Sequence, residues 1–136
     1  DVKKNGARYE VHTHNGTRSI QRPPADLARE MQQRGAGEIV VNAIDRDGAM
    51  KGYDLDLIRS VRAATTLPLT VLGGAGSLQD VAGLISEFGI MGVCAGSLFV
   101  FKGVYRAVLI NYPRPAEKAA LLTQSPAVVP TGGASR

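Results

Sequence analysis

The chain has 136 residues, of which 44% are hydrophobic, and a formal net charge of +4 at pH 7. Its Lys and Arg residues are scattered, and four Tyr, three Phe and no Trp supply no basic stripe with stacking aromatics, which argues against nucleic-acid binding. The sequence shows neither an apolar run of about 18 residues nor a signal-peptide pattern, so no membrane association is expected. A single cysteine fits a reducing compartment, and we expect one soluble, cytoplasmic domain.

The first elements expected in the chain are the two strands of a β-hairpin. Segments 9–14 and 17–20 are joined by Asn15-Gly16, which favours the two positive-φ positions of a tight type I′ turn. His12 and His14 have the spacing of a metal-binding pair. Because no third ligand clusters near them, we interpret both as ordinary hairpin residues and expect no metal site.

After the hairpin, helices alternate with short apolar strands. The strands are expected over 38–42, 67–72 and 92–95. The helices are indicated by apolar stripes at Leu27, Ala28 and Met31, at Leu55, Ile58 and Val61, and at Leu78, Val81, Leu84 and Ile85. Pro23-Pro24 and Ser77 favour two of the helix starts. A last short helix is expected over 105–110, and the Pro-rich segment 113–136 is expected to be a loose tail.

Each expected strand leads into a loop with polar or very small residues. The loops are Asp45-Arg-Asp47-Gly48, Gly73-Gly74-Ala75-Gly76 and Ala95-Gly96-Ser97. In a (β/α)₈ barrel the active site lies at the C-terminal ends of the strands, and the loops after strands 7 and 8 bind phosphate. Such a barrel takes roughly 250 residues. We therefore expect an α/β fold that is half of a phosphate-binding (β/α)₈ barrel.

The candidate site residues also have simpler interpretations. The loop 73–76 alone is typical of a flexible strand-to-helix turn, and the second small-residue loop, 95–97, makes phosphate binding the preferred hypothesis. Asp45 and Asp47 alternate along the chain, so both carboxylates can face the barrel mouth, whereas a solvated charged turn is the alternative. Cys94 lies in an apolar strand and is expected to be an inert core residue.

Five motifs together resemble one known family, the cyclase subunit of imidazole glycerol phosphate synthase, in its C-terminal half. The motifs are Gly35-Ala-Gly-Glu-Ile39, Asp45-Arg-Asp-Gly48, Gly52-Tyr-Asp-Leu55, Gly73-Gly-Ala-Gly76 and Ala95-Gly-Ser97. The resemblance covers about residues 1–112. It implies a (β/α)₈ barrel of two similar halves, of which this chain corresponds to strands 5 to 8, cut at the end of strand 5. It implies no cofactor and no metal.

The resemblance also implies roles for single residues. Asp1 corresponds to a catalytic general acid–base residue at the end of strand 5. Asp45, Asp47 and Gly48 correspond to the acidic turn that binds substrate. Glu38 corresponds to a member of the charged ring through which ammonia enters from a glutaminase subunit. The phosphate site would comprise Gly73, Gly74, Gly76, Ala95, Gly96 and Ser97.

The activity that the resemblance implies belongs to histidine biosynthesis. Glutamine-derived ammonia converts a ribulosyl-formimino-carboxamide nucleotide to imidazole glycerol phosphate and an aminoimidazole carboxamide nucleotide. The other catalytic carboxylate belongs to the N-terminal half, so this chain alone is expected to have negligible activity. The expected partners are a glutaminase subunit, a phosphorylated substrate, and an N-terminal half barrel or a second copy.

Two alternatives remain open at this point. The chain has Leu72 and Asn42-Ala43 where the family more usually has Ser and Thr-Ser, and segment 98–113 resembles relatives from surface-polysaccharide gene clusters. Those relatives are thought to supply ammonia for amidation of a sugar. The second alternative is a non-catalytic half barrel that binds phosphate and associates with itself through exposed strand edges.

Overall fold

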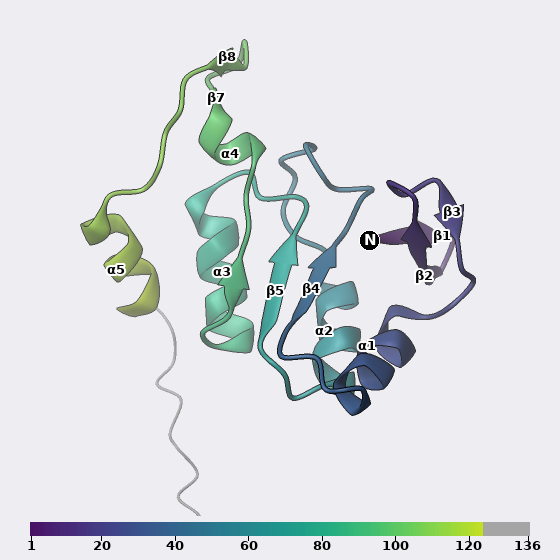
Figure 1. Cartoon of the computed structure of the whole chain (residues 1–136). Coiled ribbons are helices and arrows are strands. Elements are labelled where there is room, and N and C mark those ends of the chain that lie inside the picture. The colour runs from purple at the N-terminus through teal and green to yellow at the C-terminus, as the bar shows by residue number, and fades with distance from the viewer. Residues whose placement is uncertain (124–136) are drawn as a thin grey trace, which may run out of the picture.

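The computed structural model describes residues 1–123 and shows an α/β fold, in which helices pack on a parallel sheet (Figure 1). The elements in chain order are β1 (Val2–Asn5), β2 (Arg8–Thr13), β3 (Arg18–Ser19), α1 (Pro24–Gln33), β4 (Ile39–Asn42), α2 (Leu55–Ala64), β5 (Leu69–Leu72), α3 (Leu78–Phe88), β6 (Gly92–Val93), α4 (Ser97–Val100), β7 (Phe101–Lys102), β8 (Ala107–Val108) and α5 (Pro115–Thr123). No helix among residues 1–123 is both long and apolar enough to span a membrane.

The N-terminal segment forms a three-stranded antiparallel sheet in the order β1-β2-β3. The expected turn is confirmed, because Asn15 and Gly16 have φ values of 55° and 78° and the Thr17 N–H donates to the His14 carbonyl at 3.2 Å. The strand β1 was not expected from the sequence. Its exposed positions are polar, and Val2 is its single buried residue, so the apolar pattern is too short to indicate a strand.

The second sheet is parallel, in the order β4-β5-β6, which confirms the expected alternation of strands and helices. Val41 lies opposite Val71, and Val71 lies opposite Val93. The first sheet joins the edge of the second through a parallel bridge between Val2 and Ala43. The antiparallel sheet is therefore attached beside the C-terminal end of β4, next to the loop that carries Asp45 and Asp47.

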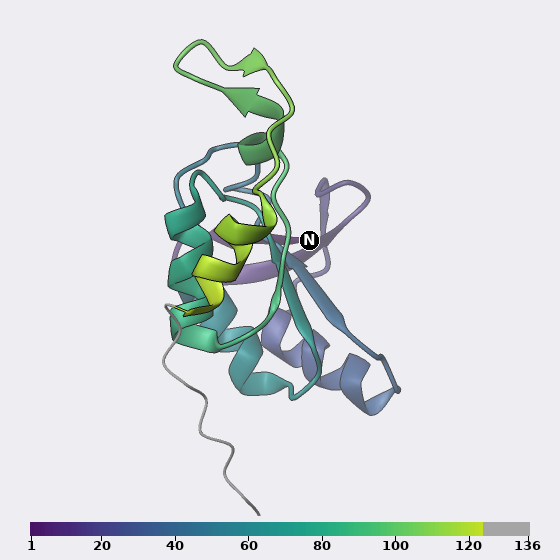
Figure 2. The same ribbon diagram turned by 90° about the vertical axis from the view of Figure 1, so that its left-hand side faces the viewer.

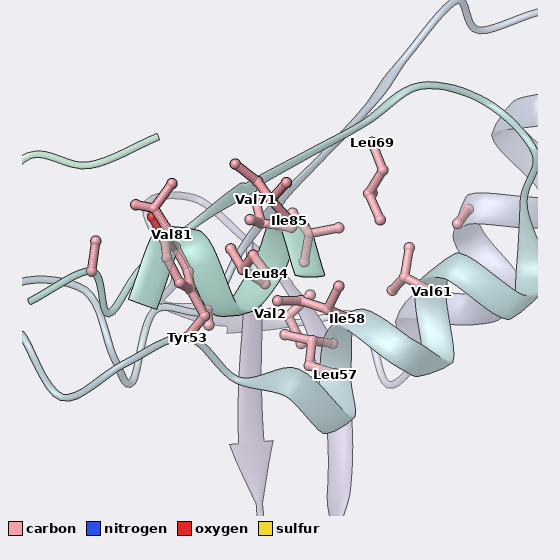
Figure 3. Packing of buried hydrophobic residues seen from close by; sticks show 14 residues of the cluster. Val2, Tyr53, Leu57, Ile58, Val61, Leu69, Val71, Val81, Leu84 and Ile85 are labelled. Atoms are coloured by element: carbon pink, nitrogen blue, oxygen red, sulfur yellow. The ribbon is translucent and has the colours of Figure 1, made fainter. Parts of the chain in front are cut away.

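The core lies between one face of the parallel sheet and the helices (Figure 3). Its most deeply buried side chains are Leu57, Val61, Val71 and Leu84, which come from α2, β5 and α3. The expected stripes of α2 and α3 are confirmed at Ile58 and Val61 and at Val81, Leu84 and Ile85. The expected N-cap is confirmed as well, since the Ser77 side chain accepts a hydrogen bond from the Asp80 N–H. Burial of these side chains holds α2 and α3 against one face of the parallel sheet.

Within residues 1–123, the side chains on the opposite face of the parallel sheet are exposed or half-buried. Successive side chains of a strand point to opposite faces. Val41 and Val71 therefore face the helices, whereas Val40, which is 59% exposed, does not. The expectation that Cys94 is a core residue is wrong, because the thiol is exposed. The strand β6 ends at Val93, and the next side chain falls on the uncovered face.

The C-terminal part of the described chain differs from the expectation in two respects. Residues 105–110 do not form a helix. Residues 105–108 belong to the turn and second strand of the hairpin β7–β8, in which the Arg106 N–H donates to the Gly103 carbonyl, and residues 109–110 follow it without regular secondary structure. A Val-, Tyr- and Ile-rich segment favours extended structure when no apolar surface is at hand to bury a helical stripe. Within the expected loose tail, residues 115–123 form α5, which contacts α3, and residues 124–136 lie outside the described part.

Candidate functional site

The loops that follow β4, β5 and β6 meet at the C-terminal edge of the parallel sheet. They line one small pocket, whose residues are Asp47, Gly48, Leu72, Gly73, Gly74, Ala75, Cys94, Ala95, Gly96 and Ser97. The strands run parallel, so their C-terminal ends lie at the same edge, as the sequence predicted. The structure thus brings the two glycine-containing loops and one carboxylate of the acidic turn together.

Glycine is required in the loop after β5 because other backbone lies very close. A Cβ on Gly74 would lie 2.2 Å from the Gly52 carbonyl oxygen, and a Cβ on Gly76 would lie 2.3 Å from the Met50 carbonyl oxygen. In addition, the Gly52 N–H donates to the Gly74 carbonyl at 2.8 Å. These contacts pack the loop after β5 against the loop after β4. The small residues therefore hold the two loops together, which also shapes the pocket.

Several backbone donors at the pocket are available to a ligand. Among residues 1–123, the N–H groups of Gly74, Gly96 and Ser97 make no hydrogen bond, and neither does the Ser97 hydroxyl. The N–H of Gly76 differs, because it donates to the Asp80 carboxylate at 2.9 Å as part of the α3 cap. The available donors therefore come from both loops, whereas the Gly76 donor is used within the fold.

The structure separates the two carboxylates of the acidic turn. Asp47 lines the pocket with the glycine loops. Asp45 instead accepts a hydrogen bond from the Lys4 N–H at 2.5 Å and lies beside the N-terminal sheet. The turn is irregular rather than extended, since the N–H groups of both Arg46 and Asp47 donate to the Ala43 carbonyl. The alternation expected from strand geometry therefore does not apply, and the two side chains point to different pockets.

Asp54, which the sequence analysis did not single out, organises the contact between the acidic loop and the N-terminal sheet. It is 7% exposed and accepts hydrogen bonds from the Leu57 N–H and, at 2.7 Å, from the Tyr9 hydroxyl. Arg46 Nε lies 3.5 Å from the same carboxylate. Burial, followed by the hydrogen bond to Asp54, raises the pKa of Tyr9 to about 12. Asp54 comes directly before the apolar stripe of α2, and an Asp in that place is a typical N-cap residue. This signal could have identified Asp54 from the sequence.

Tyr53 connects the same loop to the end of β6. Its side chain is buried, and its hydroxyl donates to the Cys94 carbonyl at 3.0 Å. Burial raises the pKa of Tyr53 well above its usual value. Like any tyrosine, Tyr53 is protonated at neutral pH, and the raised pKa keeps its hydroxyl a donor in alkaline solution as well. Through this hydrogen bond Tyr53 holds the start of the loop 95–97 in place. We therefore assign Tyr53 a structural role at the pocket and not an acid–base role.

Asp1 and Glu38 lie outside the pocket, on the uncovered side of the sheet. Asn42 Nδ2 donates to Asp1 Oδ1 at 3.1 Å, while the buried Asn42 Oδ1 has no partner. Glu38 precedes β4 at the opposite edge of the sheet and accepts a hydrogen bond from the Thr70 hydroxyl. The two carboxylates therefore belong to opposite ends of the strands. No group of three His, Cys, Asp or Glu side chains suited to a metal occurs within residues 1–123.

Comparison with known proteins places this geometry in a family. The model of the family described as "Histidine biosynthesis protein" matches residues 1–106. The chain belongs to this family. The match extends from Asp1 through all three loops of the pocket and ends in the hairpin β7–β8. The pocket, Asp1 and Glu38 are thus all part of the histidine biosynthesis family domain.

Named relatives agree with the family. A Leptospira interrogans protein, provisionally named imidazole glycerol phosphate synthase subunit HisF, is 57% identical over 114 residues, which are 84% of this chain and 45% of that protein. The similarly named Vibrio vulnificus hisF3 is 50% identical over 90% of this chain and 48% of its own length. Imidazole glycerol phosphate synthase subunit HisF of Hyphomonas neptunium is 41% identical over 74% of this chain and 40% of its own length. The chain therefore spans about half the length of these relatives.

Proposed function

We propose that this chain is the C-terminal half of a cyclase of the imidazole glycerol phosphate synthase type. In this proposal, ammonia reacts with a ribulosyl-formimino-carboxamide nucleotide. The products are imidazole glycerol phosphate and an aminoimidazole carboxamide nucleotide. The observation that carries the proposal is the 57% identity over 84% of the chain to a relative with that name. The family match covers every loop of the pocket.

The pocket supports a phosphate site in this proposal. A phosphate needs several converging donors, and backbone N–H groups of small residues can approach it closely. Gly74 and Gly96 contribute such donors from two loops, and Ser97 adds both an N–H and a hydroxyl. Asp47 lies in the same pocket, where its carboxylate can accept hydrogen bonds from substrate hydroxyl groups beside Gly48.

Asp1 is the proposed general acid–base residue of this half. It lies at the C-terminal end of the sheet, where Asn42 holds one carboxylate oxygen and leaves the other oxygen free to exchange a proton. Asn42 itself is held close to this carboxylate, with its own Oδ1 buried and without a partner in the described residues. Proton transfer by Asp1 would serve the cleavage and ring-closure steps that follow the attack of ammonia.

The uncovered sheet face supports a partner half in this proposal. Val40 and the Cys94 thiol are exposed there, and an N-terminal half barrel or a second copy would bury them. Glu38 lies at the far edge of the sheet from the pocket, where a glutaminase subunit would deliver ammonia. The proposed ammonia path therefore runs from Glu38, at the N-terminal ends of the strands, through the closed barrel to Asp1, at their C-terminal ends.

A second candidate function, ammonia supply for sugar amidation, is favoured by one segment. Residues 97–108 contain α4 and the hairpin β7–β8. From the sequence alone, segment 98–113 is expected to resemble relatives from surface-polysaccharide gene clusters. The hairpin lies at the same end of the sheet as the pocket (Figure 1), and Arg106 contacts Gly48, which lines the pocket. The hairpin can therefore influence which substrates the pocket binds. In this case the fold, the phosphate site and the ammonia path are retained, but no imidazole product forms.

The two candidate functions can be separated by product analysis. The chain is co-expressed with the N-terminal half of the Leptospira interrogans relative, supplied with ammonium and the nucleotide, and the products are separated by chromatography. We expect imidazole glycerol phosphate from the mixture, negligible product from the chain alone, and at least a hundredfold loss with Asp1→Asn, which removes the proton-transferring group. Arg8→Gln, a change at an exposed residue outside the pocket lining, is the control. A well-assembled mixture without imidazole product contradicts the cyclase proposal.

A further inference from the structure

The proposed phosphate pocket lacks a cation among its lining residues. Asp47 is the single charged side chain that lines it, and this carboxylate would repel a phosphate dianion. Arg46, the neighbour of Asp47, is turned away, since its guanidinium contacts the Gly52 carbonyl and the Asp54 carboxylate. Neutral backbone donors would have to offset this repulsion alone. A pocket for a dianion with that charge pattern calls for a positive group from outside the three loops.

The hairpin β7–β8 places one cation at the rim of this pocket. Arg106 Nη2 donates to the Gly48 carbonyl at 3.3 Å. Gly48 lines the pocket, and a Cβ on it would lie 3.8 Å from Ser97 Oγ. Figures 1 and 2 show the hairpin rising above the C-terminal ends of the strands, on the side where the loops lie. Gly48 therefore contacts the guanidinium through its carbonyl and lies next to the Ser97 hydroxyl.

Arg106 lies in the hairpin turn in a backbone conformation that is uncommon for arginine. Its φ is 49°, in the left-handed region that glycine or asparagine adopts more easily than arginine. The hairpin turn would therefore be formed at lower cost with another residue. The guanidinium is also held over the Phe101 ring, with its central carbon 4.7 Å from the ring centroid. This stacking leaves the N–H edge of the guanidinium directed at the Gly48 loop.

We propose that Arg106 is a ligand of the phosphate group in this pocket. The bond to the Gly48 carbonyl is to a neutral acceptor, and an incoming phosphate oxygen is a stronger one, so the guanidinium exchanges the first for the second. The phosphate is then held by backbone donors below and by Arg106 above, and the hairpin β7–β8 becomes part of the substrate site. This inference rests on the phosphate site of the proposed function.

The test is a titration of the full chain with inorganic phosphate, followed by the amide resonances of Gly96 and Ser97. We expect Arg106→Gln to weaken binding about tenfold, because it keeps a donor for the Gly48 carbonyl but loses the charge. Arg106→Lys should weaken it two- to threefold. Lys102→Gln removes one charge from the same hairpin and should change binding less than twofold. Unchanged resonances of α2 and α3 establish that each variant is folded.

The outcomes separate this inference from the phosphate site itself. If the parent chain binds phosphate and Ser97→Asp abolishes binding, the site is established. Arg106→Gln within twofold of the parent would then overturn the role of Arg106 alone. An equal loss with Lys102→Gln would also overturn it, because general charge would account for the effect. If the parent chain does not bind phosphate, both the site and the role of Arg106 are overturned.

Discussion

At the scale of single residues, Asp54 is the most consequential group to which the sequence assigned no role of its own, although it lies within one of the five motifs. One buried carboxylate caps α2, accepts the Tyr9 hydroxyl from the N-terminal sheet and faces Arg46 of the acidic loop. Arg46 and Asp47 are adjacent in the chain, so fixing the first restrains the second. Asp54 thereby links the N-terminal sheet, through Tyr9, to the position of Asp47, which is a candidate substrate-binding residue.

The hydrogen bond between Tyr9 and Asp54 gives a pH-dependent prediction. The pKa of Tyr9 is raised from 10.0 to about 12 in the folded chain. The protonated phenol therefore stabilises the fold fully below pH 10, and this contribution is lost as the pH rises to about 12. Tyr9→Phe should lower the free energy of unfolding by about 1 kcal/mol at pH 7. The difference between parent and variant should shrink between pH 10 and pH 12.

Urea unfolding of parent and Tyr9→Phe chains across this pH range makes the measurement. Tyr105→Phe is the matched control, because Tyr105 is 96% exposed and its hydroxyl has no partner within the described residues. A constant difference between parent and Tyr9→Phe from pH 7 to pH 12 would show that the hydrogen bond to Asp54 does not set the stability.

At the scale of elements, the position of the loop after β5 depends on the cap of α3. Asp80 accepts the N–H groups of Gly76 and Ser77, while the Ser77 hydroxyl accepts the Asp80 N–H. This capping box directs the chain from the pocket into the helix. The glycine loop 73–76 is therefore fixed at one end by β5 and at the other end by the α3 cap. Both attachments determine the direction in which the available Gly74 N–H points.

Removal of this cap should destabilise the chain measurably. Ser77→Ala is expected to lower the free energy of unfolding by about 1 kcal/mol, since an N-cap hydroxyl contributes about that amount. Ser86→Ala, on the exposed side of the same helix, is the control and should be neutral or slightly stabilising. Urea midpoints provide the comparison. If the two variants were equally stable, the cap would not be what holds the loop.

The sequence predicted elements well where an apolar stripe coincided with a helix or strand start signal. The helix α3 combines Ser77 with buried Val81 and Leu84, and its start and inner face were both predicted. The hairpin β7–β8 lacked this agreement, because its Val and Tyr side chains are exposed and bury nothing. Exposed apolar residues carry no periodic signal of burial, so the helix expected at 105–110 was wrong.

The candidate site was predictable only in part for a related reason. Small residues at strand ends identified the two loops that meet at the pocket. The separation of Asp45 from Asp47 depends on the turn at the Ala43 carbonyl, a local geometry that alternation does not describe. Arg106 reaches Gly48 from 58 residues away. Contacts over such a distance along the chain follow from the arrangement of elements, which a single sequence does not reveal.

At the scale of the whole molecule, the described residues 1–123 cover one face of the parallel sheet with helices and leave the other face largely exposed. The helices bury Val41 and Val71, while the other face exposes Val40 and the thiol of Cys94. In the proposed function, an N-terminal half barrel covers this second face and supplies the rest of the site to which Asp1 and the pocket belong. Cys94 is the one cysteine of the chain, so a thiol reagent used without pocket ligand reads this single position.

The most direct measurement is the rate at which a thiol reagent modifies Cys94, read by mass spectrometry of the peptide that contains it. The chain alone should react at the rate of an exposed thiol. An equimolar N-terminal half of the Leptospira interrogans relative should slow the reaction at least tenfold, because closure of the barrel buries the sheet face. Slowing that depends on the concentration of the chain itself would indicate self-association instead. An unchanged rate with an excess of the N-terminal half would contradict the half-barrel account.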